Sequence, residues 1–268
     1  MALAYLLRVV RFRLPWDASL GRNSQMTEPE QPPLDPAYFT RPDDAADEEF
    51  YSEPRMVAHL DDPARAALAE AYASRMTRGG HVLDLMASLY SHLPEHHGQE
   101  RVVGLGMNED ELRANKQLTE RLVHNLNTDP SLPFEDANFD ACLIALSVQY
   151  LIQPMAVFAD VGRVLKPGGL LMVSFSNRCF PTKAVAIWQA TDDKQHAGLV
   201  RLYFERAGGF GEPATLELSP APGESDPLWM VVARRERAPV RFITDDDDDT
   251  IEDEPPADGA VPQTEDES

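Results

Sequence analysis

The stretch that decides the fold is residues 139–176, FDACLIALSVQYLIQPMAVFADVGRVLKPGGLLMVSFS. Its apolar run 141–148 is too short for a membrane span and has polar neighbours, so it predicts a strand buried on both faces. Over 154–165 apolar residues recur every three or four positions, which predicts a helix with one buried side. Pro154 suits its first turn, where a missing N–H has no partner to lose.

The Lys-Pro-Gly-Gly turn at 166–169 predicts the end of that helix. Proline cannot continue the hydrogen-bond ladder, and glycine accepts the positive φ of a turn. Residues 170–175 then predict a second buried strand. A strand, a crossover helix and a parallel strand form a right-handed βαβ unit, so the chain is expected to be an α/β protein.

This segment resembles the centre of class I S-adenosylmethionine-dependent methyltransferases of the type 11 kind. There an LPF-x-D-x-x-FD lead-in precedes a strand, a helix and an R-V-L-K-P-G-G turn, matched here by LPFEDANFD at 132–140 and RVLKPGG at 163–169. The resemblance covers about residues 50–235. It implies a Rossmann-like, doubly wound, mostly parallel seven-stranded sheet, S-adenosylmethionine as cofactor, and methyl transfer to a small-molecule acceptor.

Composition sets the expected domain limits. The chain has 268 residues and a formal charge of −21, but the acids concentrate after residue 245, where no base follows. We expect a disordered or leader segment at 1–48, a methyltransferase-like domain at 49–236, and a disordered acidic tail at 237–268. This charge balance argues against nucleic acid and anionic membranes as partners. A monomer and a homodimer both remain open.

Cysteine usage bears on the compartment. Cys142 and Cys179 offer neither a disulfide framework nor a CxxC spacing, so a reducing, cytoplasmic interior is expected. Residues 1–25 are apolar and arginine-rich without the charge order of a secretory signal. Three interpretations stay open for them: an extension upstream of a true start at Met26, an organelle presequence directing the chain to a stroma or matrix, or a surface amphipathic helix.

The segment before the domain is rich in proline. Residues 27–47 carry five prolines among acids, which predicts an extended arm without its own core, with order beginning near Phe50. Residues 50–56 either fold over the mouth of the domain or form an aromatic staple on its outer surface.

The loop after the first predicted strand, 81–85, departs from the family. Asp84 stands where the superfamily places an acid beneath its ligand loop, and a glycine-rich turn ordinarily follows, because the backbone must approach the cofactor closely. Here residues 86–90 are Met-Ala-Ser-Leu-Tyr. The site is therefore expected to be reshaped, narrowed or lost.

The second strand, 101–105, shows a further departure. The superfamily usually ends it with an acid that binds both ribose hydroxyls, and the matching position is Gly106. Asn108 either accepts one hydroxyl or caps the next helix, with Glu111 completing a capping-box-like pair; the cap is favoured. After a third strand in 118–126, Asn125 either reads the adenine edge or belongs to a strand-end turn.

The resemblance implies a set of site residues at the carboxyl edge of the sheet. Arg178 is expected to meet a substrate carboxylate or phosphate, or to form a salt bridge. Adjacent histidines at 96 and 97 lack metal-site spacing, so no metal is expected. The candidate bases are His92 and Tyr150; the cofactor positions are Asp84, Met86, Ser88, Gly106, Met107, Asn108, Asn125, Leu126 and Ser147; the substrate positions are Asn177 and Arg178.

Further elements are predicted on both sides of the central unit. They are helices at 62–76, with Asp62 as N-cap, at 181–190 and at 196–207, and a closing antiparallel pair at 214–218 and 228–233. Three functions stay open: an active methyltransferase with a remodelled loop, a non-catalytic binding or scaffold descendant, and a domain that binds another nucleotide-like or carboxylate ligand.

Overall fold

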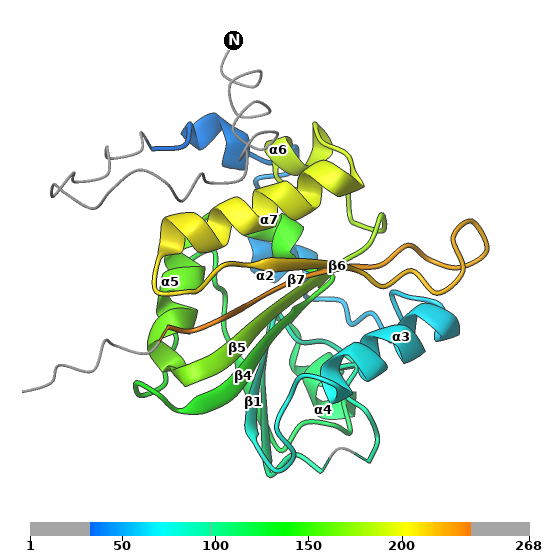
Figure 1. Ribbon diagram of the computed structural model, residues 1–268. Coiled ribbons are helices and arrows are strands. Elements are labelled where there is room, and N and C mark those ends of the chain that lie inside the picture. Colours follow the sequence, from blue (N-terminus) through cyan, green and yellow to red (C-terminus); the bar gives the residue numbers. More distant parts are fainter. Residues whose placement is uncertain (1–32, 97, 237–268) are drawn as a thin grey trace, which may run out of the picture. The chain divides into compact units, whose positions relative to one another are not determined.

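A computed structural model describes residues 33–96 and 98–236, so the expectations for residues 1–25, His97 and the tail 237–268 lie outside the described part (Figure 1). Within these ranges the strands form a seven-stranded sheet in the order β3-β2-β1-β4-β5-β7-β6. The strands are β1 His81–Leu85, β2 Arg101–Gly106, β3 Glu120–Val123, β4 Phe139–Ala145, β5 Leu165–Phe175, β6 Ala214–Glu217 and β7 Trp229–Arg234.

The strand directions confirm the doubly wound prediction. Strands β1 to β5 pair in parallel, β7 pairs antiparallel with β5, and β6 pairs antiparallel with β7. The strand order reverses between β1 and β4. In open α/β sheets ligands bind outside the carboxyl ends of the strands at such a switch point.

Helices cover both faces of the sheet, with α5, α6 and α7 on one side and α3 and α4 on the other (Figure 1). None of the described helices is long and apolar enough to cross a bilayer. The helices are η1 Pro36–Phe39, α2 Asp47–Phe50, α3 Asp62–Ala73, α4 Glu109–Ala114, η2 Val148–Tyr150, α5 Pro154–Val164, α6 Ala186–Gln189 and α7 Asp193–Ala207, where η denotes a 3-10 helix.

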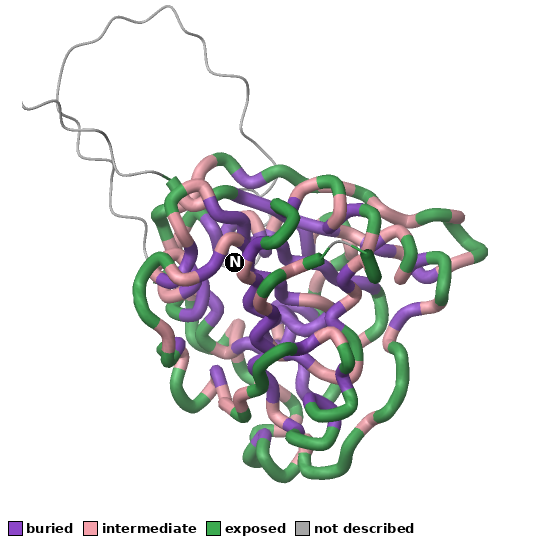
Figure 2. The backbone as a smooth tube through the Cα atoms, turned by 90° about the horizontal axis from the view of Figure 1, so that it is seen from below, coloured by how far each residue is buried: buried purple, intermediate pink, exposed green. Residues whose placement is uncertain are grey.

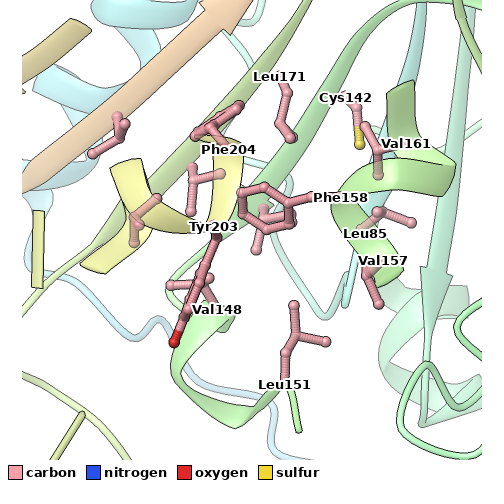
Figure 3. Packing of buried hydrophobic residues seen from close by; sticks show 14 of the residues in the cluster. Leu85, Cys142, Val148, Leu151, Val157, Phe158, Val161, Leu171, Tyr203 and Phe204 are labelled. Atoms are coloured by element: carbon pink, nitrogen blue, oxygen red, sulfur yellow. The ribbon is translucent and has the colours of Figure 1, made fainter. Parts of the chain in front are cut away.

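Each face of the sheet carries its own apolar core, because successive strand residues point to opposite faces. On the α5/α7 side Phe158 lies edge-on to Tyr203 and to Phe204, with ring centroids 5.9 and 5.0 Å apart (Figure 3). On the α3 side Leu68 and Tyr72 are fully buried. Accordingly, most buried residues lie toward the centre of the described part, and most exposed residues lie around them (Figure 2).

The central unit differs from expectation at its turn. The helix ends at Val164 and β5 begins at Leu165, so the Lys-Pro-Gly-Gly turn lies within the strand rather than before it. The pairing with β4 shifts register between Phe139 and Ala141, which absorbs the extra residues. Gly168 has φ 85°, and its N–H donates to the Arg235 carbonyl.

Three other boundaries are corrected. Asp61, not Asp62, is the N-cap of α3, because its side chain accepts from the Ala64 N–H. Strand β3 is four residues long, shorter than predicted. The helix expected over 181–190 is limited to α6, which begins at Ala186.

The prediction of an extended arm before Phe50 is wrong for residues 33–47, which pack on the domain. The Phe39 ring lies 6.2 Å from the Tyr203 ring. Lys183 is fully buried and donates to the Ala45 carbonyl at 2.7 Å, with Asp47 3.4 Å away. A buried ammonium needs such partners, and among the described residues this segment supplies its hydrogen-bond acceptor and its acids.

Candidate functional site

A cavity of about 500 Å³ opens at the carboxyl ends of β1, β2, β4 and β5, at the switch point of the sheet. Residues of the segment 47–59 form one of its walls, so the expectation that 50–56 fold over the mouth is confirmed. Every site residue predicted from the sequence lines this cavity: Asp84, Met86, Ser88, His92, Gly106, Met107, Asn108, Asn125, Leu126, Ser147, Tyr150, Asn177 and Arg178.

The glycine-free loop after β1 makes its turn with side chains in place. Met86 has φ 55°, a left-handed conformation that favours glycine. The Ala87 N–H then donates to the Leu105 carbonyl at 2.9 Å, which brings the loop across the end of β2. A β-carbon at Gly106 would collide with the Ala87 carbonyl oxygen. The loop therefore requires glycine at position 106, where the superfamily pattern led us to expect an acid.

Asn108 caps α4, as favoured from the sequence. Its Oδ1 accepts the N–H groups of Asp110 and Glu111, both at 3.0 Å. Its amide nitrogen donates to the carbonyls of Tyr51 and Ser52. With its amide oxygen and nitrogen both engaged, Asn108 has little capacity left for a ribose hydroxyl.

Glu111 has a role that the sequence did not reveal. Its carboxylate accepts the Ser88 hydroxyl at 2.5 Å and the Arg55 backbone N–H at 2.6 Å. It is 7% exposed. The carboxylate therefore joins the loop after β1 to the N-terminal wall of the cavity, instead of completing a capping box with Asn108.

Two polar side chains at the cavity lack a hydrogen-bond partner for one atom. Asp84 Oδ2 and Ser147 Oγ are buried and unpaired within the described part of the chain. Burial raises the pKa of Asp84 to about 7, against the opposing effect of a Ser91 hydrogen bond. Such orphan groups cost free energy unless a ligand or water satisfies them.

The two candidate bases differ in their chemistry. The Tyr150 hydroxyl accepts the Phe180 N–H at 2.8 Å, and burial raises its pKa to about 12, so it is protonated at neutral pH. Burial, with smaller contributions from the charges of Arg65 and His59, lowers the pKa of His92 to about 4. His92 is therefore a neutral imidazole at pH 7.

Asn125 adopts the turn alternative. Its Oδ1 accepts the Asn127 N–H at 2.9 Å and its Nδ2 donates to Glu48 at 2.8 Å. Leu126, 4% exposed, supplies an apolar surface beside it.

The N-terminal wall contributes Tyr51, Arg55 and His59 to the cavity lining. Tyr51 and Arg55 belong to the segment 50–56, for which folding over the mouth was one of two predictions, whereas His59 was missed because no motif marks it. Only long-range contacts place them, such as the Arg55–Glu111 hydrogen bond. Burial lowers the pKa of His59, which leaves a second neutral imidazole at the site. No group of three or more His, Cys, Asp or Glu residues within 33–96 and 98–236 is placed to hold a metal ion.

Comparison with known proteins agrees with this geometry. Residues 85–173 match a family described as "Methyltransferase domain". The putative methyltransferase in a complex with the Haloferax volcanii Trm112 methyltransferase activator shares the fold, with a TM-score of 0.50, 16% identity, and coverage of 65% of this chain and 91% of that one. The chain therefore shares the fold of that protein, and residues 85–173 are similar to the methyltransferase domain family. The family match includes β4, α5 and most of β5, the elements of the central βαβ unit.

The curated relatives of this chain match only in part. The biotin biosynthesis bifunctional protein BioHC of Teredinibacter turnerae is 29% identical over 112 residues, 42% of this chain and 20% of that protein. The demethylmenaquinone methyltransferase of Staphylococcus haemolyticus is 33% identical over 79 residues, 28% of this chain and 32% of that protein. The matched region thus spans a third or less of either relative.

Proposed function

We propose that this chain is an S-adenosylmethionine-dependent methyltransferase acting on a small-molecule acceptor. The observation that carries the proposal is the cavity at the β1/β4 switch point, where open α/β sheets bind their ligands. Its volume of about 500 Å³ lies within the range of about 300–1,000 Å³ typical of small-molecule sites.

The residues present fit two ends of the coenzyme. The unpaired oxygens of Asp84 and Ser147 suit the amino group of its methionine part. Met107 and Leu126 offer apolar surface to the adenine. The ribose lacks its usual acid, because Gly106 stands there. When bound, the coenzyme supplies an electrophilic sulfonium methyl group.

The chain's own task is then to orient the acceptor and to take up a proton where the reaction releases one. We assign the proton-accepting role to a neutral imidazole, His92 or His59, because both line the cavity. Tyr150 is better suited to positioning, since its hydroxyl is protonated and already accepts a hydrogen bond. Segment 47–59 forms one wall of the cavity in which the acceptor would lie.

The names of relatives guide the choice of acceptors to assay. One is a malonyl-[acyl-carrier protein] O-methyltransferase of a Marinomonas species, 29% identical over 65 residues, 24% of each chain. Another is the demethylmenaquinone methyltransferase. Acidic and quinone-like small molecules are therefore the first acceptor classes to test.

Calorimetric titration of S-adenosylmethionine and S-adenosylhomocysteine tests the proposal. We expect one saturable site per chain with micromolar affinity. Ser88→Phe, which places a ring in the cavity, should abolish binding, whereas Ser131→Phe at an exposed position should not. Absence of heat at millimolar ligand would reject the proposal in favour of a non-catalytic or differently liganded domain.

A further inference from the structure

Arg178 is held at the cavity by a buried acid. Its Nε donates to Asp226 Oδ1 at 2.7 Å, and Asp226 is only 8% exposed. Asp226 is fixed in turn by reciprocal hydrogen bonds with Asp61, at 2.8 and 2.7 Å. Because the tether uses only Nε, the terminal amino groups of Arg178 stay available, and its side chain is 62% exposed.

Arg55 places a second cation on the same cavity. Its guanidinium lies over the rings of Phe50 and Phe180, 4.4 and 5.0 Å from their centroids. It donates to the carbonyls of Phe50 and Glu53. Within residues 33–96 and 98–236 its guanidinium forms no ion pair, although the Glu111 carboxylate accepts the Arg55 backbone N–H at 2.6 Å. A guanidinium stacked on aromatic faces and outside any ion pair keeps N–H groups for an incoming anion.

His59 links the two arginines in space. Its pKa is lowered first by burial, is raised by the Glu111 charge, and is lowered again by the charges of Arg55 and Arg178. Arg55, His59 and Arg178 all line the same cavity. The His59 and Tyr150 rings each lie 5.9 Å from the Phe180 ring, so aromatic surface adjoins the positive charge.

We propose that Arg178 and Arg55 form a carboxylate-binding site for the methyl acceptor, whose planar or apolar body lies along Phe180. The inference rests on the proposed function and deepens it to an acceptor class, a small aromatic or apolar carboxylate. Arginine suits this role because its terminal N–H groups match the two oxygens of a carboxylate. The methionine part of the coenzyme also carries a carboxylate. The test must therefore distinguish a site for the acceptor's carboxylate from a site for the coenzyme's carboxylate.

The experiment titrates benzoate and its neutral isostere benzamide into the protein and follows ligand-detected NMR, with and without saturating S-adenosylhomocysteine. Arg178→Gln removes the anchor. The matched control is Arg113→Gln, because Arg113 is 61% exposed and also pairs with acids, on α4 and outside the cavity lining. Circular dichroism verifies that both variants fold.

We expect benzoate to bind at least about tenfold more tightly than benzamide, as charge-assisted hydrogen bonding requires. Arg178→Gln should remove this preference and Arg113→Gln should retain it, and benzoate should still bind beside S-adenosylhomocysteine. The proposal would be overturned if benzoate and benzamide bound with equal affinity. It would also be overturned if Arg178→Gln and Arg113→Gln reduced the affinity for benzoate equally. Displacement of benzoate by S-adenosylhomocysteine would also overturn it, because the arginines would then serve the coenzyme.

Failure of the proposed function is a separate outcome. If S-adenosylhomocysteine does not bind at all, methyl transfer is rejected, while charge-selective binding of benzoate through Arg178 would still support a carboxylate site.

Discussion

The carbonyl oxygen of Ala87 occupies the space that a β-carbon at Gly106 would need. This contact connects the two departures from the superfamily pattern, which are the glycine-free loop after β1 and the missing acid at the end of β2. The loop after β1 has lost its glycines and crosses the end of β2, where a hydrogen bond from Ala87 to Leu105 holds it. The ribose-binding acid is then sterically excluded from position 106.

Gly106→Ala should destabilise the domain by about 1–3 kcal/mol, the usual cost of overpacking, because the obstructing atom belongs to the backbone and cannot rotate away. Chemical denaturation measures the loss. Gly211→Ala is the control, since a β-carbon there meets its nearest atom at 3.9 Å. Equal stability of the two variants would mean that the loop does not lie across β2.

Glu111→Ala should release the N-terminal wall of the cavity. The carboxylate accepts from both Ser88 and the Arg55 backbone, so its removal leaves two donors unpaired, at about 1–3 kcal/mol each when buried. Hydrogen exchange of residues 50–59 should accelerate. Glu109→Ala on the same helix, which breaks only an exposed pair with Arg113, should leave that exchange unchanged. Unaltered exchange in both variants would contradict the link.

Lys183→Met should loosen residues 33–48. The buried ammonium binds the Ala45 carbonyl and lies near Asp43 and Asp47, and breaking a buried pair typically costs about 3–5 kcal/mol. Limited proteolysis should cut this segment faster. Lys166→Met, at a pair 40% and 33% exposed with Asp140, should cost about 1 kcal/mol or less. If both variants lost the same amount of stability, the packing of residues 33–48 on Lys183 would be contradicted.

Asp84→Asn should change how stability depends on pH. Burial raises the pKa of Asp84 from 3.8 to about 7, so the folded state binds its proton more tightly than the unfolded state. The contribution of Asp84 to stability is therefore fully present below about pH 4 and falls as pH rises toward 7.

The uncharged amide avoids this loss. The free energy of unfolding of Asp84→Asn, relative to that of the wild type, should therefore be on the order of 2 kcal/mol more favourable at pH 7 than at pH 5. Denaturation curves at both pH values measure it. Asp62→Asn, at a side chain 94% exposed, is the control. An advantage independent of pH would mean that Asp84 is ionised throughout.

Local sequence patterns predicted the central βαβ unit correctly. They failed where contacts between segments distant in the sequence determine the structure. The strand–helix–strand of 139–176 is correct because burial on both faces leaves a continuous apolar run. The predicted start of β5 was wrong, since Leu165 already pairs with Phe139 of β4, and no local signal carries that contact.

The candidate site shows the same division. The Asn108 cap was visible, because a cap involves neighbours within three residues. The place of His59 was not visible, and that of Arg55 at the mouth was one of two alternatives, because contacts with α4 and with Phe180 bring these residues to the cavity. The sequence showed that glycines and the ribose acid are missing, but their steric connection required the fold.

A crystal structure of the chain grown with millimolar S-adenosylhomocysteine tests the central claim most directly. We predict the coenzyme in the switch-point cavity, its homocysteine end beside Asp84 and Ser147, its adenine beside Leu126, and no carboxylate on its ribose hydroxyls. A cavity without coenzyme density, or coenzyme bound elsewhere on the molecule, would contradict the account.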